Sequence, residues 1–162
     1  MEENWIMTRY MMNRTLKHIL FDKCLEYVEN RLITIQSTIE EIQESLSSET
    51  KSSAGDKHET GRAMLQLERE KAGQQLAEIE NVKNALTQIN IEKISETIIL
   101  GSIVYTSQFN YFISISAGLL TVDSEIFYAI SPQTPMGQLL LGKHVGDSFV
   151  FREQKIVIEN II

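Results

Sequence analysis

Two long segments with apolar residues in heptad spacing, separated by a short polar stretch, constrain the fold of this chain more than any other feature. The first segment runs from about Thr15 to Ser47, and neither proline nor glycine interrupts it. Its apolar residues recur at alternating spacings of three and four, at Phe21, Leu25, Val28, Leu32, Ile35, Ile39, Ile42 and Leu46. Such a narrow stripe predicts a helix on the order of 45 Å long that packs along one partner helix.

The second segment carries a matching stripe. Leu65, Ala72, Ile79 and Leu86 recur every seven residues, and Leu76, Val82 and Ile89 supply the second position. Gly61 and Gly73 each cost a helix about 1 kcal/mol against alanine, so the end nearest the break should be the softer one. We expect the two segments to form an antiparallel helical hairpin, a coiled coil of two helices. A continuous helix in an intermolecular coiled coil is the alternative, which Gly55 and the serine cluster disfavour.

The polar break, residues 47–60, forms the tip of this hairpin. Asp56 and Glu59 lie three residues apart, where the second helix should begin. In one interpretation they form a capping box, with Asp56 as the N-cap and Glu59 at the third helical position. In the other they are functional carboxylates. Both interpretations can hold together, because capping would fix the direction of the carboxylates.

The composition excludes several classes of protein. The chain has 162 residues, a formal net charge of −7 and a single cysteine, Cys24. An acidic chain is a poor independent binder of nucleic acid, and one cysteine allows no internal disulfide. No signal peptide and no run of roughly 20 apolar residues is present, so we expect a cytoplasmic protein without a membrane span. Cys24 is best interpreted as a buried small residue, and His18 and His144 have no evident partners.

After about residue 94 the pattern changes to short runs rich in β-branched and aromatic residues. Five of them read as strands, at 98–105, 111–116, 125–130, 148–151 and 155–162, and a short helix is expected from Met136 to Leu141, ended by Gly142. The sequence thus predicts an α+β protein: a helical hairpin over residues 1–94 and a small, mostly antiparallel β domain over residues 95–162. The pattern leaves the structure of residues 1–14 open.

The C-terminal third resembles the C-terminal domain of the bacterial Gre transcript-cleavage factors. The resemblance rests on the segment 130–147, which reads Ile-Ser-Pro-Gln-Thr-Pro-Met-Gly-Gln-Leu-Leu-Leu-Gly-Lys-His-Val-Gly-Asp. It implies an FKBP-like β domain after a helical hairpin, in the order expected here. At the tip, Gly55, Asp56 and Glu59 fit the family pattern, whereas Thr60, Arg62 and Ala63 replace the Asn, Glu and Tyr that are usual there.

The resemblance implies a partner and a mechanism. In Gre factors the hairpin enters the secondary channel of RNA polymerase, and the tip carboxylates help to hold Mg²⁺ in the polymerase active site, where backtracked RNA is cut. By this resemblance Asp56 would coordinate the metal, and Glu59 would orient water or support the ion. The chain would need no cofactor of its own, would contact nascent RNA only within the polymerase and would act as a monomer. It would not be a self-sufficient enzyme.

The resemblance also implies that the β domain docks at the rim of the channel. Candidate contacts there are Ile130, Ser131, Pro135, Met136 and Lys143. Two other functions stay open: a regulator that occupies the channel without promoting cleavage, or inhibits it, and a self-associating coiled-coil scaffold. An FKBP-type prolyl isomerase is disfavoured, because the short β domain has no evident pattern for an aromatic-lined pocket.

Overall fold

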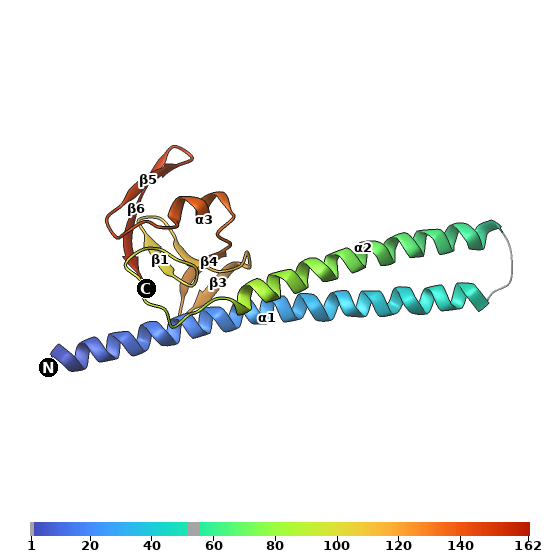
Figure 1. Cartoon of the computed structure of the whole chain (residues 1–162), viewed down its shortest axis with the longest axis horizontal. Coiled ribbons are helices and arrows are strands. Elements are labelled where there is room, and N and C mark those ends of the chain that lie inside the picture. Colours follow the sequence, from blue (N-terminus) through green and yellow to red (C-terminus); the bar gives the residue numbers. More distant parts are fainter. Residues whose placement is uncertain (1, 52–55) are drawn as a thin grey trace. The chain divides into compact units, whose positions relative to one another are not determined.

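The computed structural model describes the backbone of residues 2–51 and 56–162, with side chains except at positions 2–6, 10, 50 and 56–58. The elements follow one another as α1 (Glu2–Lys51), α2 (Asp56–Thr87), β1 (Ile103–Thr106), β2 (Asn110–Ile113), β3 (Gly118–Val122), β4 (Glu125–Ile130), α3 (Pro135–Leu140), β5 (Ser148–Phe151) and β6 (Gln154–Ile161) (Figure 1). The predicted α+β class, a helical hairpin followed by a small sheet, is confirmed. Residues 2–14, which the sequence left open, continue α1 as helix.

The chain forms two compact units. One is Tyr27–Asn84, the long helical hairpin, and the other combines Met1–Glu26 with Ala85–Ile162. The predicted domains, 1–94 and 95–162, divide the chain by sequence order instead of by contacts, and they stay a prediction. None of the helices in the described part of the chain is long and apolar enough to cross a membrane.

In the hairpin unit, α1 and α2 run antiparallel, and each buries part of its predicted stripe (Figure 1). The buried apolar side chains are Val28, Ile35, Ile42 and Leu46 on α1 and Ala72 and Ile79 on α2. They recur at heptad spacing, which keeps each on the face toward the partner helix. Lys83 and Glu29 face each other across the seam with 3.9 Å between Nζ and Oε1.

The second unit holds a six-stranded sheet with the order β3-β4-β2-β1-β6-β5. Five strands were expected, and the additional one is β3 (Gly118–Val122). All neighbouring pairs among the described strands are antiparallel except β2 and β4, which are parallel. The parallel pair arises because β3 occupies the outer edge and β4 returns between it and β2.

One face of this sheet packs on α3. The shared core contains Ile98, Val104, Tyr111, Ile113, Met136, Leu140, Ile156 and Ile158. Pro135 begins α3, where its missing N–H leaves no hydrogen bond unmade, and Gly142 follows the helix with φ +77°. The predicted helix and its glycine terminator are therefore confirmed, with the helix ending at Leu140.

The first part of α1 covers the opposite face of the sheet. Alternation along the strands places Ile103, Phe112 and Ser114 on this face. The Sγ atom of Cys24 lies 3.6 Å from Oγ of Ser114, and Leu20, one turn earlier on α1, is fully buried. Cys24 is buried as predicted.

Candidate functional site

The tip of the hairpin lies between the end of α1 at Lys51 and the start of α2 at Asp56. Asp56 is the first residue of α2 and Glu59 follows one turn later, so the two positions share one face of the helix. The Glu59 side chain is exposed. Residues 52–55, including Gly55, lie outside the described residues, as does the side chain of Asp56. Whether Asp56 caps α2 therefore stays a prediction.

A metal site would need oxygen ligands from more than this pair. Within the described residues, no group of three or more His, Cys, Asp or Glu side chains is arranged to hold an ion. Mg²⁺ is commonly held by one or two carboxylates that a protein supplies, together with water and substrate phosphates. Two carboxylates in one helical turn could therefore contribute to a Mg²⁺ site only as part of a larger, shared site.

The second candidate site is the segment from Ile130 to Lys143, at the start and end of α3. Thr134 caps the helix: its Oγ1 accepts a hydrogen bond from the Gly137 N–H at 3.0 Å and donates one to the Ser131 carbonyl at 2.8 Å. Gly137 is packed so closely that an added Cβ would lie 2.3 Å from the Ser131 carbonyl oxygen. These contacts hold the helix start tightly against the preceding turn.

The five residues proposed to bind a partner occupy different environments. Ile130 and Ser131 are half-buried at the end of β4, and Pro135 is exposed at the start of α3. Met136 is only 9% exposed and belongs to the core, which leaves it little surface for a partner. Lys143 is half-buried, with its Nζ atom 5.9 Å from the centre of the Phe149 ring.

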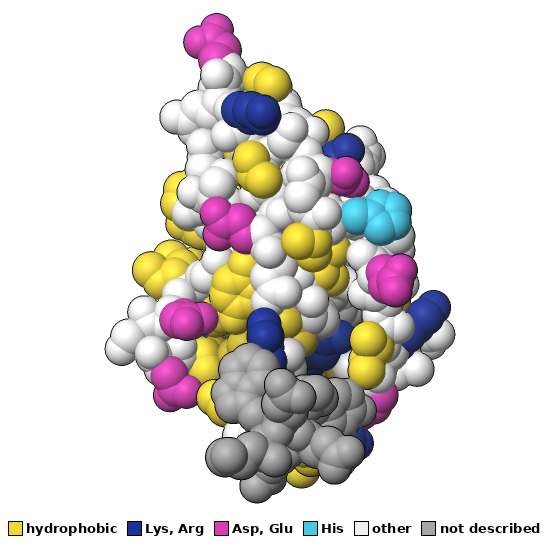
Figure 2. Space-filling model, turned by 90° about the vertical axis from the view of Figure 1, so that its left-hand side faces the viewer, with side chains coloured by type: hydrophobic (Ala, Val, Ile, Leu, Met, Phe, Trp, Pro, Cys, Tyr) yellow, Lys and Arg dark blue, Asp and Glu magenta, His cyan; other side chains and the backbone are white. Residues whose placement is uncertain are grey.

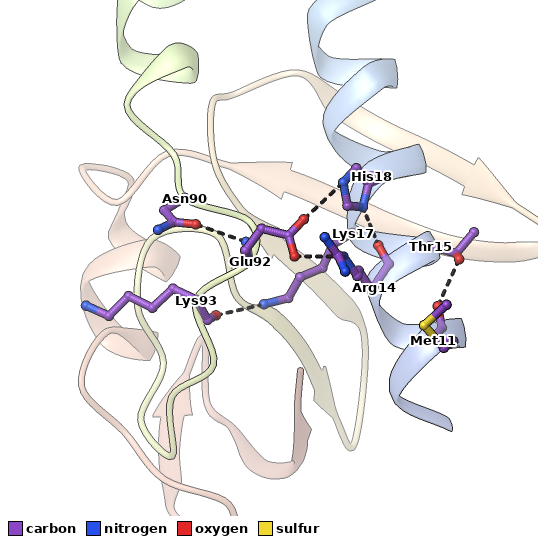
Figure 3. A network of polar contacts seen from close by, with 8 residues as sticks. All are labelled: Met11, Arg14, Thr15, Lys17, His18, Asn90, Glu92 and Lys93. Atoms are coloured by element: carbon purple, nitrogen blue, oxygen red, sulfur yellow. Dashed lines mark hydrogen bonds and ion pairs between the residues drawn. The ribbon is translucent and has the colours of Figure 1, made fainter. Parts of the chain in front are cut away.

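A polar cluster, which the sequence did not indicate, joins α1 to the segment after α2 (Figure 3). Glu92 accepts a hydrogen bond from Arg14 Nε at 2.7 Å, and its other oxygen lies 3.1 Å from Nε2 of His18. The Nδ1 atom of His18 lies 2.7 Å from the Arg14 carbonyl oxygen. His18 thus has partners that its sequence position did not reveal, because Glu92 is far away along the chain.

Lys17 lies beside this cluster and is 5% exposed. Its ammonium group donates a hydrogen bond to the carbonyl of Lys93 at 3.3 Å (Figure 3). Burial lowers the pKa of Lys17, and the neighbouring Glu92 carboxylate opposes part of that effect. The cluster therefore serves to satisfy a buried lysine and to fasten the segment after α2 onto α1.

His144 also has partners. The carboxylate of Asp147 accepts a hydrogen bond from the His144 backbone N–H at 2.8 Å, and Nδ1 of His144 lies 3.7 Å from the same oxygen. Both residues belong to the segment 130–147 that carries the family resemblance, with His144 directly before its Val-Gly-Asp. The arrangement shapes the turn that leads into β5.

The chain is similar to a known protein structure at low sequence identity. No protein-family model matches the chain, and no significant match is found among curated proteins. Among solved structures, the chain is similar to that of the transcription factor Gfh1, with 23% identity, 84% of this chain and 91% of that chain covered, and a TM-score of 0.34. A similarity at this level carries no functional conclusion by itself.

Proposed function

We propose that this chain is a Gre-like factor that binds RNA polymerase, inserts its hairpin into the secondary channel and stimulates cleavage of backtracked RNA. The observation that carries the proposal is the order of parts: a long hairpin with Asp56 at the first residue of α2, followed by a β domain containing the Gre-like segment 130–147. The 32 residues of α2 correspond to about 48 Å of helix, enough to carry the tip into a deep channel.

The chemistry proposed for the tip needs the polymerase. Phosphodiester hydrolysis is favoured by two divalent cations that stabilise the attacking and leaving oxygens. Asp56 would help to hold a Mg²⁺ ion shared with the polymerase, and Glu59 would support the ion or orient the attacking water. The exposure of Glu59 agrees with a group that becomes a ligand only in a complex. The chain would accordingly have no nuclease activity alone, and it would act in the cytoplasm as a monomer.

The β domain is proposed to dock at the rim of the channel through Ile130, Ser131, Pro135, Met136 and Lys143. Exposed Pro135 and half-buried Lys143 would make the direct contacts, whereas buried Met136 would support them from the core. Pro135→Ala should weaken polymerase binding while leaving the protein folded. Unchanged affinity in a folded variant would count against docking at this segment.

A second function is favoured by the residues after Glu59. Thr60, Arg62 and Ala63 depart from the Gre pattern, and Arg62 places a positive charge where the family has a carboxylate. The chain could then occupy the channel without promoting cleavage, or inhibit the polymerase. If these three residues are the reason why the chain does not promote cleavage, the triple variant Thr60→Asn/Arg62→Glu/Ala63→Tyr should gain cleavage activity.

The deciding experiment measures RNA cleavage in a purified backtracked elongation complex, with wild-type protein and with Asp56→Ala/Glu59→Ala. Glu70→Ala is the matched control, since Glu70 is an exposed carboxylate on the same helix away from the tip. Stimulation that only the tip variant loses would support the cleavage factor. Binding without stimulation would favour the channel-occupying regulator. Absence of both would leave the coiled-coil scaffold, for which a dimer in solution is expected.

A further inference from the structure

A groove lies in the unit that contains the sheet, between the early turns of α1 and the turn that joins β3 to β4. Its volume is about 660 Å³. We name it the methionine groove after the residues that define it: Met7, Met11, Met12 and Leu16 on α1, and Asp123 and Glu125 at the β3–β4 turn. Neither the tip nor the segment 130–147 contributes to it, so it is separate from both sites proposed above.

The α1 side of the groove is unusually apolar for an exposed surface. Met7, Met11 and Met12 are 62%, 55% and 67% exposed, although they lie within two turns of one helix. Figure 2 shows hydrophobic side chains exposed on one side of the molecule. Single exposed apolar residues are ordinary, but a contiguous group commonly marks a binding surface. Methionine is suited to such surfaces, because its flexible side chain adapts to the shape of a partner.

The charge of the groove has one sign. Among the lining residues whose side chains the structure describes, Asp123 and Glu125 are the only charged ones. Burial raises the pKa of Tyr105, and the neighbouring Glu125 carboxylate adds to this effect, which places Glu125 beside the Tyr105 ring. The positive charge of Arg14, on the same helix, is already directed to Glu92. A partner therefore meets an apolar floor with an acidic wall.

We propose that the methionine groove binds a basic amphipathic helix of a partner protein. Apolar residues of that helix, spaced at i, i+3/i+4 and i+7, would lie on the methionines, and lysines or arginines beside them would face Asp123 and Glu125. The stretch from Met7 to Ile19 of α1, about 18 Å long, matches roughly three turns of such a helix. Charge complementarity selects this partner over an acidic or uncharged one.

A second copy of the chain fits the groove less well. A symmetric dimer places the same surface of each protomer in the interface. Asp123 and Glu125 of both copies would then meet the same apolar region, to which the described lining residues contribute no basic group. The chain also carries a formal net charge of −7, which opposes its self-association.

The test uses fluorescence anisotropy of labelled peptides of about 16 residues with the full chain. One peptide has leucines at helical spacing and lysines elsewhere, a second is the same composition scrambled, and a third has glutamates for the lysines. We expect the first to bind at least about tenfold more tightly than the other two, with affinity falling as salt rises. Asp123→Asn/Glu125→Gln should weaken it and reduce the salt dependence.

The groove itself is tested by Met7→Ser/Met11→Ser/Met12→Ser, which should weaken binding at least about tenfold. Val150→Ser is the matched control, because Val150 is 65% exposed but lies on β5. Methionine methyl NMR gives a second readout: the peptide should shift Met7, Met11 and Met12 but neither exposed Met64 on α2 nor buried Met136.

Three results would overturn the proposal. The first is equal binding of the ordered and scrambled lysine peptides, which would show a general charge attraction. The second is unchanged binding by the methionine variant. The third is a wild-type dimer in sedimentation analysis that the methionine variant converts to monomer, since the occupant would then be a second copy.

Discussion

The Sγ atom of Cys24 on α1 lies 3.6 Å from the hydroxyl oxygen of Ser114, which directly follows β2. Both side chains are buried. Burial raises the pKa of the Cys24 thiol from 9.0 to about 11, and the Ser114 hydroxyl opposes part of this effect. The contact therefore joins a helix to a sheet through a thiol that must stay protonated.

This thiol should make the protein sensitive to alkaline pH. The folded chain holds the proton more tightly than the unfolded chain, so this contribution is complete below about pH 9 and is lost as pH rises through 11. The loss is on the order of 2–3 kcal/mol. Urea unfolding at several pH values should show a steeper alkaline decline in wild type than in Cys24→Ala. Parallel declines in the two proteins would contradict this assignment, since the tyrosine and lysine contributions are common to both.

Gly137 should not tolerate a side chain. An alanine Cβ would lie 2.3 Å from the Ser131 carbonyl oxygen and 3.0 Å from backbone atoms of Pro132. Because these are backbone atoms, relief requires displacing the start of α3, and we expect a loss of about 2–3 kcal/mol in the free energy of unfolding. Thermal and urea unfolding of Gly137→Ala measure it. A stability within error of wild type would show that the turn before α3 is not packed this closely.

Alanine at Gly61 and Gly73 should have the opposite effect. Both lie within α2, and an added Cβ would meet no atom within 4 Å at either position. Each substitution should strengthen the helix by about 1 kcal/mol. Amide hydrogen exchange in α2 should slow most between the tip and Gly73. Gly101→Ala is the contrasting control, because its φ of +91° and the close Ile89 methyl make that substitution destabilising.

The turn between β3 and β4 should be improved by glycine. Asp123 and Ser124 both adopt positive φ, 47° and 70°, which glycine accepts without steric cost. Ser124→Gly should raise the free energy of unfolding by about 0.5–1 kcal/mol. Thr121→Gly, an exposed position inside β3, should instead lower it, since glycine weakens a strand. The same sign for both substitutions would argue against strain at the turn.

Loss of the Glu92 carboxylate should loosen the attachment of the segment after α2. Glu92→Gln removes the partner of Arg14 and His18 and the negative charge that opposes part of the effect of burial on Lys17. Since Glu92 and its partners are partly exposed, we expect about 1 kcal/mol of destabilisation, decreasing with salt. The matched control, Glu29→Gln, removes a pair of 3.9 Å on the hairpin and should cost less than about 0.5 kcal/mol. Equal destabilisation by the two substitutions would show that the polar cluster contributes no more to stability than an isolated surface ion pair.

The sequence predicted the parts of the fold that depend on local periodicity. The hairpin follows from heptad spacing, and α3 follows from Pro135 and Gly142. The sequence did not predict strand β3, because the turn that follows it uses Asp123 and Ser124 in place of the glycine or asparagine that usually marks positive φ. The parallel pairing of β2 and β4 could not be predicted either, because the residues of one strand do not determine which strand it pairs with.

The apolar stripe on α1 shows why it is harder to predict which face of a helix is buried along its whole length. From Val28 onward the buried apolar residues of α1 are all predicted positions, Val28, Ile35, Ile42 and Leu46, while predicted Leu32 and Ile39 are half-buried. Before it, Leu20 and Cys24 are fully buried, whereas the predicted Phe21 and Leu25 are only half-buried. The helix there packs on a sheet instead of on α2, which turns the buried face by one residue. The even spacing of Leu20, Cys24 and Val28 was the available signal.

The candidate sites, too, were only partly predictable from the sequence. Asp56 and Glu59 were placed at the start of the second helix, and α2 begins at Asp56. The polar cluster around Glu92 could not be foreseen, because its members are more than seventy residues apart and none belongs to a recognisable motif. The acidic wall of the methionine groove could not be foreseen either, because it comes from the unrecognised β3–β4 turn.

The order of strands in the sheet has a consequence for how the protein is made. Strand β6 is hydrogen-bonded to both β1 and β5, so the sheet cannot close until Gln154–Ile161 has left the ribosome. Leu20 and Cys24 are made before the sheet on which they pack, whereas Tyr27–Asn84 forms a compact unit of its own. During synthesis the hairpin can therefore form early, while the apolar side chains of Leu20 and Cys24 stay exposed until the sheet forms. A newly made chain is most vulnerable to aggregation in this interval, and a chaperone that recognises the beginning of α1 would act at the moment when it is most needed.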